Sequence, residues 1–354
     1  MRPRLAYLHL PKAAGTSIRA AVSSYYSSQD TVPWSFDRHL FGDHPRLAEV
    51  NEPIFLGSPE ELKSYLYMEG HWTISTMLEA FEPADVVCIL REPRARFLSQ
   101  YTFWRGWPAE MHAQWEPYPG ARFAQLPLRE YCTSESIAHQ ADNLVTRLIL
   151  GPNRLAPNEA HIKPGDIDTV AAEAIRRVDE LGYVDVLERG DAVYDDFEDW
   201  FGSPLQQERL NVTDLARGEP VDLKDLVDPV VLALINNRNA SDVQIWEHVA
   251  AQRGLGKLEV QSMSESAYDS AITRVTIAHT KLKAQIEAKR IAPPPPETVA
   301  VELEPPADLP RASAPVRLGR LFLRGPRVWR ERINDEIECR RKTPDQDAES
   351  SSTT

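Results

Sequence analysis

Short apolar runs that alternate with helical patterns constrain the fold of this 354-residue chain most strongly. Residues 5–10 and 84–90 have the length and apolar content of buried strands, and shorter strands are predicted at 54–57 and 182–187. Apolar residues at helical spacing predict helices at 16–28, from Ser58 onward, and at 73–81, 93–105, 139–150, 168–181, 193–201 and 240–253. Strands alternating with helices predict an α/β fold in which a central parallel β-sheet is flanked by helices.

The composition changes after residue 253. We expect a catalytic domain at 1–253, a helical extension at 254–291, and a Pro-rich linker with a basic, disordered tail at 292–354. Residues 311–332 hold seven arginines interleaved with Leu, Phe and Trp. Two readings of this tail stay open: a basic amphipathic surface for peripheral contact with an anionic membrane or an acidic partner, or a solvated disordered segment.

Charge and cysteine content exclude several classes of protein. The net charge of −13 argues against nucleic-acid binding, which depends on basic residues that contact phosphates. Three widely spaced cysteines offer neither a disulfide framework nor a metal-binding pair, so a reducing compartment fits best. No apolar run approaches the roughly 20 residues of a membrane span, and the first strand follows Arg4 with no signal peptide before it. We therefore expect a cytoplasmic protein, with peripheral contact at the inner face of the membrane if the tail binds lipid.

The stretch His-Leu-Pro-Lys-Ala-Ala-Gly-Thr-Ser at 9–17 has the composition of a phosphate-binding loop. Small residues between a strand and a helix let backbone N–H groups face an anion, while Lys12 adds a positive charge and Thr16 and Ser17 add hydroxyl donors. No Lys-Ser or Lys-Thr pair follows Gly15, so the hydroxyl that usually binds Mg²⁺ is missing. The pattern predicts a nucleotide site without a metal. The alternative is an ordinary strand–turn–helix.

A second stretch, 90–101, places an arginine and a serine around the start of a helix. Arg91 ends a predicted central strand, where open α/β sheets bind their ligands. Pro93 begins a helix and Ser99 follows about two turns later, so a guanidinium and a hydroxyl could hold one phosphate. The alternative is that the other arginines of this helix, Arg94 above all, form a solvated face.

Together, the two stretches resemble the sulfotransferases that use 3′-phosphoadenosine 5′-phosphosulfate (PAPS), in particular the carbohydrate (heparan sulfate-like) branch. Residues 9–17 look like the family's 5′-phosphosulfate loop, and residues 91–101 look like its 3′-phosphate motif. The resemblance covers about residues 4–253 and departs at Ala13, where the family often has Thr. It implies a P-loop-like nucleotide-binding fold. The missing membrane anchor and the few cysteines suggest a bacterial-type soluble member of the family.

The resemblance also implies roles for single residues. Lys12 would contact the transferring sulfuryl group and the bridging oxygen. The 5′-phosphate would be held by the loop residues Ala14, Gly15, Thr16 and Ser17. The 3′-phosphate would be held by Arg91 and Ser99. PAPS is then the cosubstrate, 3′,5′-adenosine bisphosphate (PAP) is the product, and no metal is expected.

Sulfuryl transfer also needs a general base for the acceptor hydroxyl. His71, in Glu-Gly-His-Trp, lies between the two stretches and is similar to the catalytic-histidine segment of this branch. The alternative is a structural histidine that caps the following helix. Glu69 and His44 are lesser candidates for the base, and His9 is expected to shape the loop.

The resemblance suggests a glycan or glycolipid acceptor. Aromatic residues that follow the second stretch could stack on sugar rings or simply belong to the core: Trp104, Trp107, Trp115, Tyr118 and Tyr131. Two other functions stay open, a nucleotide-binding protein without transferase activity and a nucleotide kinase-like enzyme. The sequence gives no oligomeric state.

Overall fold

The computed structural model describes residues 4–13, 15–42, 44–107, 109–116, 118, 120–205 and 221–291. Residues 1–290 form one compact unit. The proposed roles of Ala14 and of the tail at 292–354, with its basic segment 311–332, lie outside the described residues.

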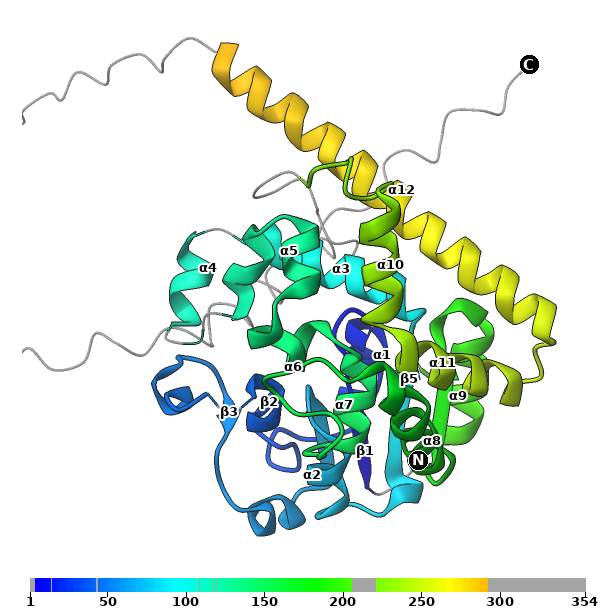
Figure 1. The fold of residues 1–354 in the computed structure, drawn as a ribbon. Helices are drawn as coiled ribbons and strands as arrows, with labels where there is room; N and C mark the ends of the chain where they lie inside the picture. The colour runs from blue at the N-terminus through cyan, green and yellow to red at the C-terminus, as the bar shows by residue number, and fades with distance from the viewer. Residues whose placement is uncertain are drawn as a thin grey trace, which may run out of the picture. The chain divides into compact units, whose positions relative to one another are not determined.

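A four-stranded, all-parallel sheet organises the described part of the chain, in the order β4-β1-β5-β6 (Figure 1). Its strands are β1 (Leu5–Leu8), β4 (Tyr67–Gly70), β5 (Val86–Leu90) and β6 (Tyr183–Val186). At the end of β1, Leu8 stands opposite Gly70 on one side and Cys88 on the other. The prediction of an α/β fold with a parallel sheet flanked by helices is confirmed.

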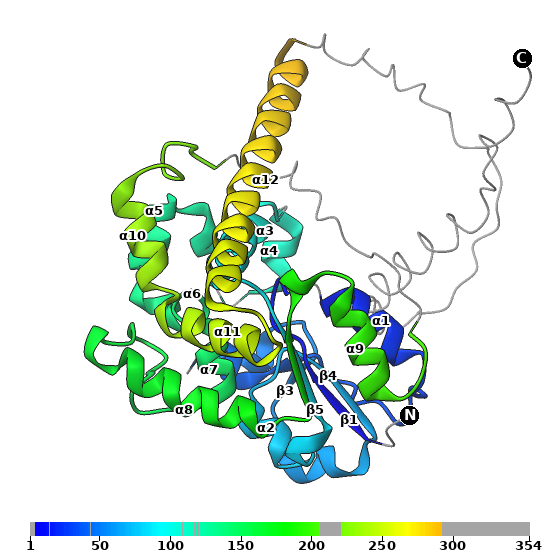
Figure 2. The same ribbon diagram turned by 90° about the vertical axis from the view of Figure 1, so that its right-hand side faces the viewer.

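Helices cover both faces of the sheet (Figure 2). Every residue of β1 is buried, as expected for a strand with helices on both sides. Leu5 and Tyr7 pack toward α1 (Gly15–Ser23) and α9 (Ala192–Phe201). Ala6 and Leu8 belong to the cluster that packs the opposite face. The helices of that face are α2 (Ile74–Leu78), α7 (Leu144–Leu150), α8 (Ile167–Asp179) and α11 (Ala240–Gln252).

The remaining described helices include α3 and the helices that follow it along the chain. They are α3 (Pro93–Arg105), α4 (Ala109–Gln114), α5 (Leu128–Thr133), α6 (Ala138–Ala141), α10 (Pro229–Asn237) and α12 (Lys257–Ile291). Ala271 and Val275 of α12 share a buried cluster with Phe97 and Leu98 of α3, so the long last helix packs on the same unit. None of the described helices is both long and apolar enough to cross a membrane.

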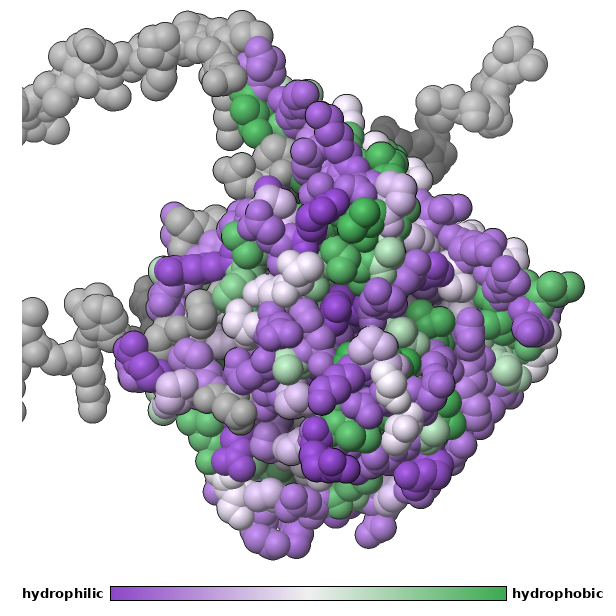
Figure 3. Space-filling view, in the orientation of Figure 1, coloured by the Kyte–Doolittle hydropathy of each residue, from purple (hydrophilic) through white to green (hydrophobic). Residues whose placement is uncertain are grey.

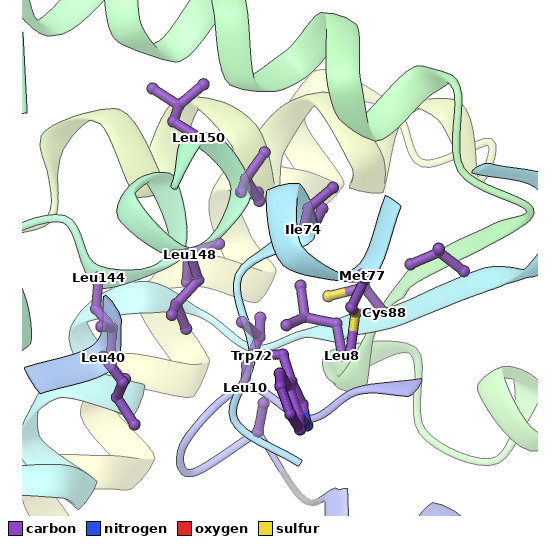
Figure 4. Packing of buried hydrophobic residues seen from close by; sticks show 14 of the residues in the cluster. Leu8, Leu10, Leu40, Trp72, Ile74, Met77, Cys88, Leu144, Leu148 and Leu150 are labelled. Carbon is purple, nitrogen blue, oxygen red and sulfur yellow. The ribbon is translucent and has the colours of Figure 1, made fainter. Parts of the chain in front are cut away.

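The largest core cluster fills the space between the sheet, α2 and α7 (Figure 4). Trp72 is fully buried there beside Leu8 and Leu10, with Met77 and Cys88 close by. The outer surface in Figure 3 is mostly hydrophilic, and its hydrophobic residues are scattered. The burial of Trp72 fixes the chain immediately after His71.

Several predicted elements differ in the structure. Strand β4 was not predicted, and residues 54–57 contribute β3 (Ile54–Phe55), which pairs with β2 (Phe36–Asp37) in a separate small sheet. The predicted helix at Ser58 is a 3₁₀ helix, Pro59–Ser64, although the side chain of Glu61 does accept the expected bond from the Ser58 N–H. Residues 139–150 form two helices, because Asn143 adopts a left-handed conformation between them.

Candidate functional site

Three of the predicted site residues follow neighbouring strands at one edge of the sheet. His71 directly follows β4, Arg91 directly follows β5, and Lys12 lies four residues after the end of β1, which runs between those two strands. Because the strands are parallel, their carboxyl ends meet at this edge, where α/β sheets bind ligands. The fold therefore gathers positions that are far apart in the sequence.

The turn between β1 and α1 has an unusual backbone at its lysine. Lys12 adopts a φ of 66°, a left-handed conformation that is uncommon outside glycine and concentrates at functional sites. Its Nζ lies 4.0 Å from the centre of the Phe103 ring on α3. Burial, together with the nearby charge of Arg91, lowers the pKa of Lys12 to about 8. Binding an anion beside it would favour the charged amine.

The first turn of α1 begins at Gly15, three residues after this lysine. Gly15, Thr16 and Ser17 form that turn, and the first N–H groups of a helix have no partner within it. The positive end of the helix thus lies beside Lys12, as an anion site requires. The assignment of these three residues to the 5′-phosphate remains a prediction.

Arg91 ties the second stretch to the first. Its Nη1 donates a hydrogen bond to the backbone oxygen of Lys12 over 2.8 Å. Burial lowers the pKa of Arg91 to about 10, and the charge of Arg274 on α12 acts in the same direction. Two guanidinium groups near each other favour a bound anion between or beside them.

Ser99 lies on α3 one helical turn before Phe103. Residues four apart share a helix face, so Ser99 is on the side of α3 that Phe103 presents to Lys12. Ser99 is partly exposed. Its position is compatible with a hydroxyl donor near the lysine turn, and its contact with a 3′-phosphate remains a prediction.

The arginines of α3 do not form a solvated face, so that alternative is wrong. Arg94 donates to Glu92 over 2.6 Å and to Ser264 of α12 over 2.8 Å, and its guanidinium lies over the ring of Tyr268. Arg96 is fully buried and donates to Gln100. Arg105 donates to backbone oxygens of residues 124–126. The partners of Arg94 on α12 and those of Arg105 at 124–126 come from later in the chain, which is why helical spacing alone could not reveal them.

His71 has a defined orientation at the end of β4. Gly70 adopts a φ of 132°, and a Cβ there would lie 2.4 Å from the backbone oxygen of Ser35, so only glycine fits. The Nδ1 of His71 is hydrogen-bonded to the backbone oxygen of His9. Because a carbonyl can only accept, Nδ1 carries the proton, and the neutral ring presents Nε2 as an acceptor.

The protonation state of His71 follows from its surroundings. Burial lowers the pKa of His71 to about 4, with smaller contributions in the same direction from Arg19 and Lys12. The ring is therefore neutral near pH 7, as a general base must be. The alternative that His71 caps α2 is wrong, because the side chain of Thr73 accepts the bond from the Thr76 N–H.

The other candidate bases are engaged elsewhere. The carboxylate of Glu69 accepts bonds from Arg19 over 2.7 Å and from Tyr67 over 2.9 Å. His44 accepts a bond from the backbone N–H of Arg46. His9 shapes the site through its backbone oxygen, which agrees with its expected loop-shaping role.

Two contributors to the site were missed by the sequence analysis. Phe103 contacts Lys12, and its spacing of four residues from Ser99 was the available signal. Arg19 of α1 bonds Glu69 of β4 and so joins the lysine turn to the histidine strand. No signal in the sequence links those two residues, which lie 50 positions apart.

No known family model matches this chain, and no curated protein matches it. Among the described residues, no three His, Cys, Asp or Glu side chains are grouped as metal ligands would be. The geometry of the strand ends therefore carries the functional argument.

Proposed function

We propose that the protein is a PAPS-dependent sulfotransferase with a P-loop-like nucleotide site. One observation carries the proposal: Lys12, His71 and Arg91 lie together at the carboxyl ends of three adjacent parallel strands. The two stretches that resemble the family's phosphate motifs meet there through the bond from Arg91 to the backbone of Lys12.

The cationic side of the site suits a doubly phosphorylated nucleotide. The lysine turn and the start of α1 would hold the 5′-phosphosulfate, and Arg91 with Ser99 would hold the 3′-phosphate. Lys12 and Arg91 are both partly buried and both have a lowered pKa, which means that each charge is destabilised in the empty site. An anionic ligand would relieve that repulsion and gain strong charge-assisted hydrogen bonds.

The reaction transfers one sulfuryl group and one proton. The acceptor hydroxyl oxygen attacks sulfur while Nε2 of His71 takes the hydroxyl proton. The bond between sulfur and the bridging oxygen of PAPS breaks, and PAP leaves with the electron pair. Lys12 stabilises the negative charge that develops on that oxygen, as in phosphoryl transfer.

The weak basicity of His71 in the empty site is consistent with this role. PAPS brings several negative charges close to the ring, and negative charge raises the pKa of a nearby imidazole. Loading the cosubstrate therefore moves the pKa of His71 from about 4 toward neutrality, where a general base is most effective.

Binding and transfer can be tested separately. Calorimetry with PAP, without added metal, should show binding that Mg²⁺ does not improve. Labelled sulfate from PAPS should then appear in a glycan or glycolipid fraction of cell extract. PAP binding without transfer to any fraction would favour the nucleotide-binding alternative, and Mg²⁺-dependent turnover of ATP would favour the kinase-like one.

A further inference from the structure

A continuous set of aromatic contacts connects Lys12 with His71. From the lysine, Phe103 contacts Trp107 with ring centres 5.7 Å apart, and Trp107 stacks on Trp115 at 6.0 Å. Toward the histidine, Phe36 meets Trp115 at 5.2 Å and His71 at 5.5 Å. We call these four rings, Phe36, Phe103, Trp107 and Trp115, the aromatic arc.

The members of the arc differ in exposure. Trp115 is buried behind the others, with 9% of its surface exposed, whereas Phe103 and Trp107 are only partly buried. Trp107 therefore has one face supported by Trp115 and the remainder of its surface partly open. Tyr131, by contrast, is enclosed by Phe97 and Tyr101 and belongs to the core.

Polar groups border the arc at Trp107. The ring of His112 lies 5.9 Å from that of Trp107, and its Nε2 is 3.4 Å from the amide nitrogen of Gln125. The ion pair between Arg122 and Glu116 lies in the same region of the chain and is about half exposed. An aromatic face edged by amide, imidazole and charged groups suits a sugar, whose ring has one face of C–H bonds and a rim of hydroxyls.

We propose that Trp107 is the platform on which a sugar ring of the acceptor lies, with Phe103 directing the reactive hydroxyl toward Lys12 and His71. This inference rests on the proposed sulfotransferase function and adds a specificity residue to it. The arc ends at the proposed stabilising lysine on one side and at the proposed base on the other.

The experiment uses the full-length protein loaded with PAP. Saturation-transfer NMR is recorded with cello-, malto- and chito-oligosaccharides and, as a phenolic probe, with p-nitrophenol. We expect at least one of the saccharides to bind, and Trp107→Ala to weaken that binding roughly tenfold, the scale of one lost aromatic contact. Trp107→Phe, which keeps a ring, should recover part of the affinity.

Trp200 provides the matched control, because it is also a partly buried tryptophan stacked on another ring, that of Phe197, but on α9. Trp200→Ala should leave saccharide binding unchanged. Binding of p-nitrophenol without any saccharide, no saccharide binding at all, or equal saccharide binding by Trp107→Ala would overturn the inference. Calorimetry with PAP on the same proteins, before they are loaded, separates the two proposals. A wild-type protein that does not bind PAP contradicts the sulfotransferase function. PAP binding by Trp107→Ala shows that this variant is folded.

Discussion

The turn after β1 and the turn after β5 carry the two proposed phosphate sites, and they are held in place differently. The β1 turn relies on backbone conformation: Lys12 has a positive φ, and its carbonyl is held by Arg91. The β5 turn relies on buried charge. Glu92 is completely buried, its backbone N–H donates to Glu188, and its carboxylate accepts bonds from Ala95 and Arg94.

The proposed chemistry thus lies on a turn set by backbone conformation, and its proposed anchor lies on a turn set by buried charge. The Glu92 network is a fixed support that extends to Ser264 on α12, 172 positions later. Arg91 precedes Glu92 in the chain and donates a hydrogen bond to the backbone oxygen of Lys12, so it connects the Glu92 network to the lysine turn.

The largest expected effect is a loss of transfer rate on substitution of His71, whose ring is bonded to the backbone oxygen of His9. His71→Ala should lower the rate of sulfuryl transfer by roughly 10²–10⁴-fold, the usual loss on removing a general base. PAP affinity and melting temperature should stay near those of wild type, because Thr73 rather than His71 caps α2. Transfer rates and PAP calorimetry on one preparation provide the measurement. A variant within a few-fold of the wild-type rate would end this assignment.

The next effect is on stability, at the β5 turn. Glu92→Ala should lower the free energy of unfolding by about 3 kcal/mol, since it leaves the largely buried Arg94 without its carboxylate partner. Glu60→Ala is the matched control, because Glu60 pairs with Lys63 at an exposed site, and its effect should stay within about 0.5 kcal/mol. Urea unfolding measures both. Equal stability of the two variants would show that the buried network does not support the fold.

A smaller effect, on PAP affinity, is expected at Arg91, which connects the two turns. Arg91→Ala should weaken PAP binding by about 2 kcal/mol, or roughly 30-fold, through loss of a charge-assisted bond and of the brace on Lys12. Arg94→Ala serves as the comparison, because it should affect stability more than PAP affinity. If calorimetry gives Arg91→Ala the wild-type affinity, the 3′-phosphate assignment is wrong.

The smallest effect concerns pH and the lysine turn alone. The pKa of Lys12 is about 8 in the empty site, and a bound anion raises it. The free protein must then take up a proton to bind PAP above pH 8, so affinity should fall by up to about tenfold per pH unit there and stay level below it. Titrations from about pH 7 to about pH 9.5 test this. Lys12→Arg keeps its charge, so a fall of the same size in that variant would exclude Lys12 as the cause.

Local signals in the sequence predicted much of the sheet and the strand-end site. β1, β5 and β6 stand out as apolar runs, and the end of α9 at Gly202 follows from the left-handed conformation that glycine adopts readily. Lys12 and Arg91 were placed correctly at strand ends because their strands were predicted. β4 was missed because it is short and contains Glu69 and Gly70, so its sequence shows neither an apolar run nor a clear alternation of apolar and polar residues.

Other features could not be read locally because their partners are distant in sequence. The break between α6 and α7 depends on Asp142 and Asn143, whose side chains bond Arg238 and the backbone of Ser241 nearly 100 positions later. The burial of Arg94 likewise depends on α12. In each case a tertiary contact overrides the local pattern.

The wide spacing of the partners of Glu92 has a consequence for biosynthesis. During translation, β4, β1 and β5 can pair once the first 90 residues have emerged, but the outer edge of β5 stays unpaired until residues 183–186 follow. Glu92 then gains Glu188, and only later Ser264. The lysine turn can therefore form early on the ribosome, while the bonds of Glu92 with Glu188 and Ser264 complete the arginine turn only after those later residues have been made.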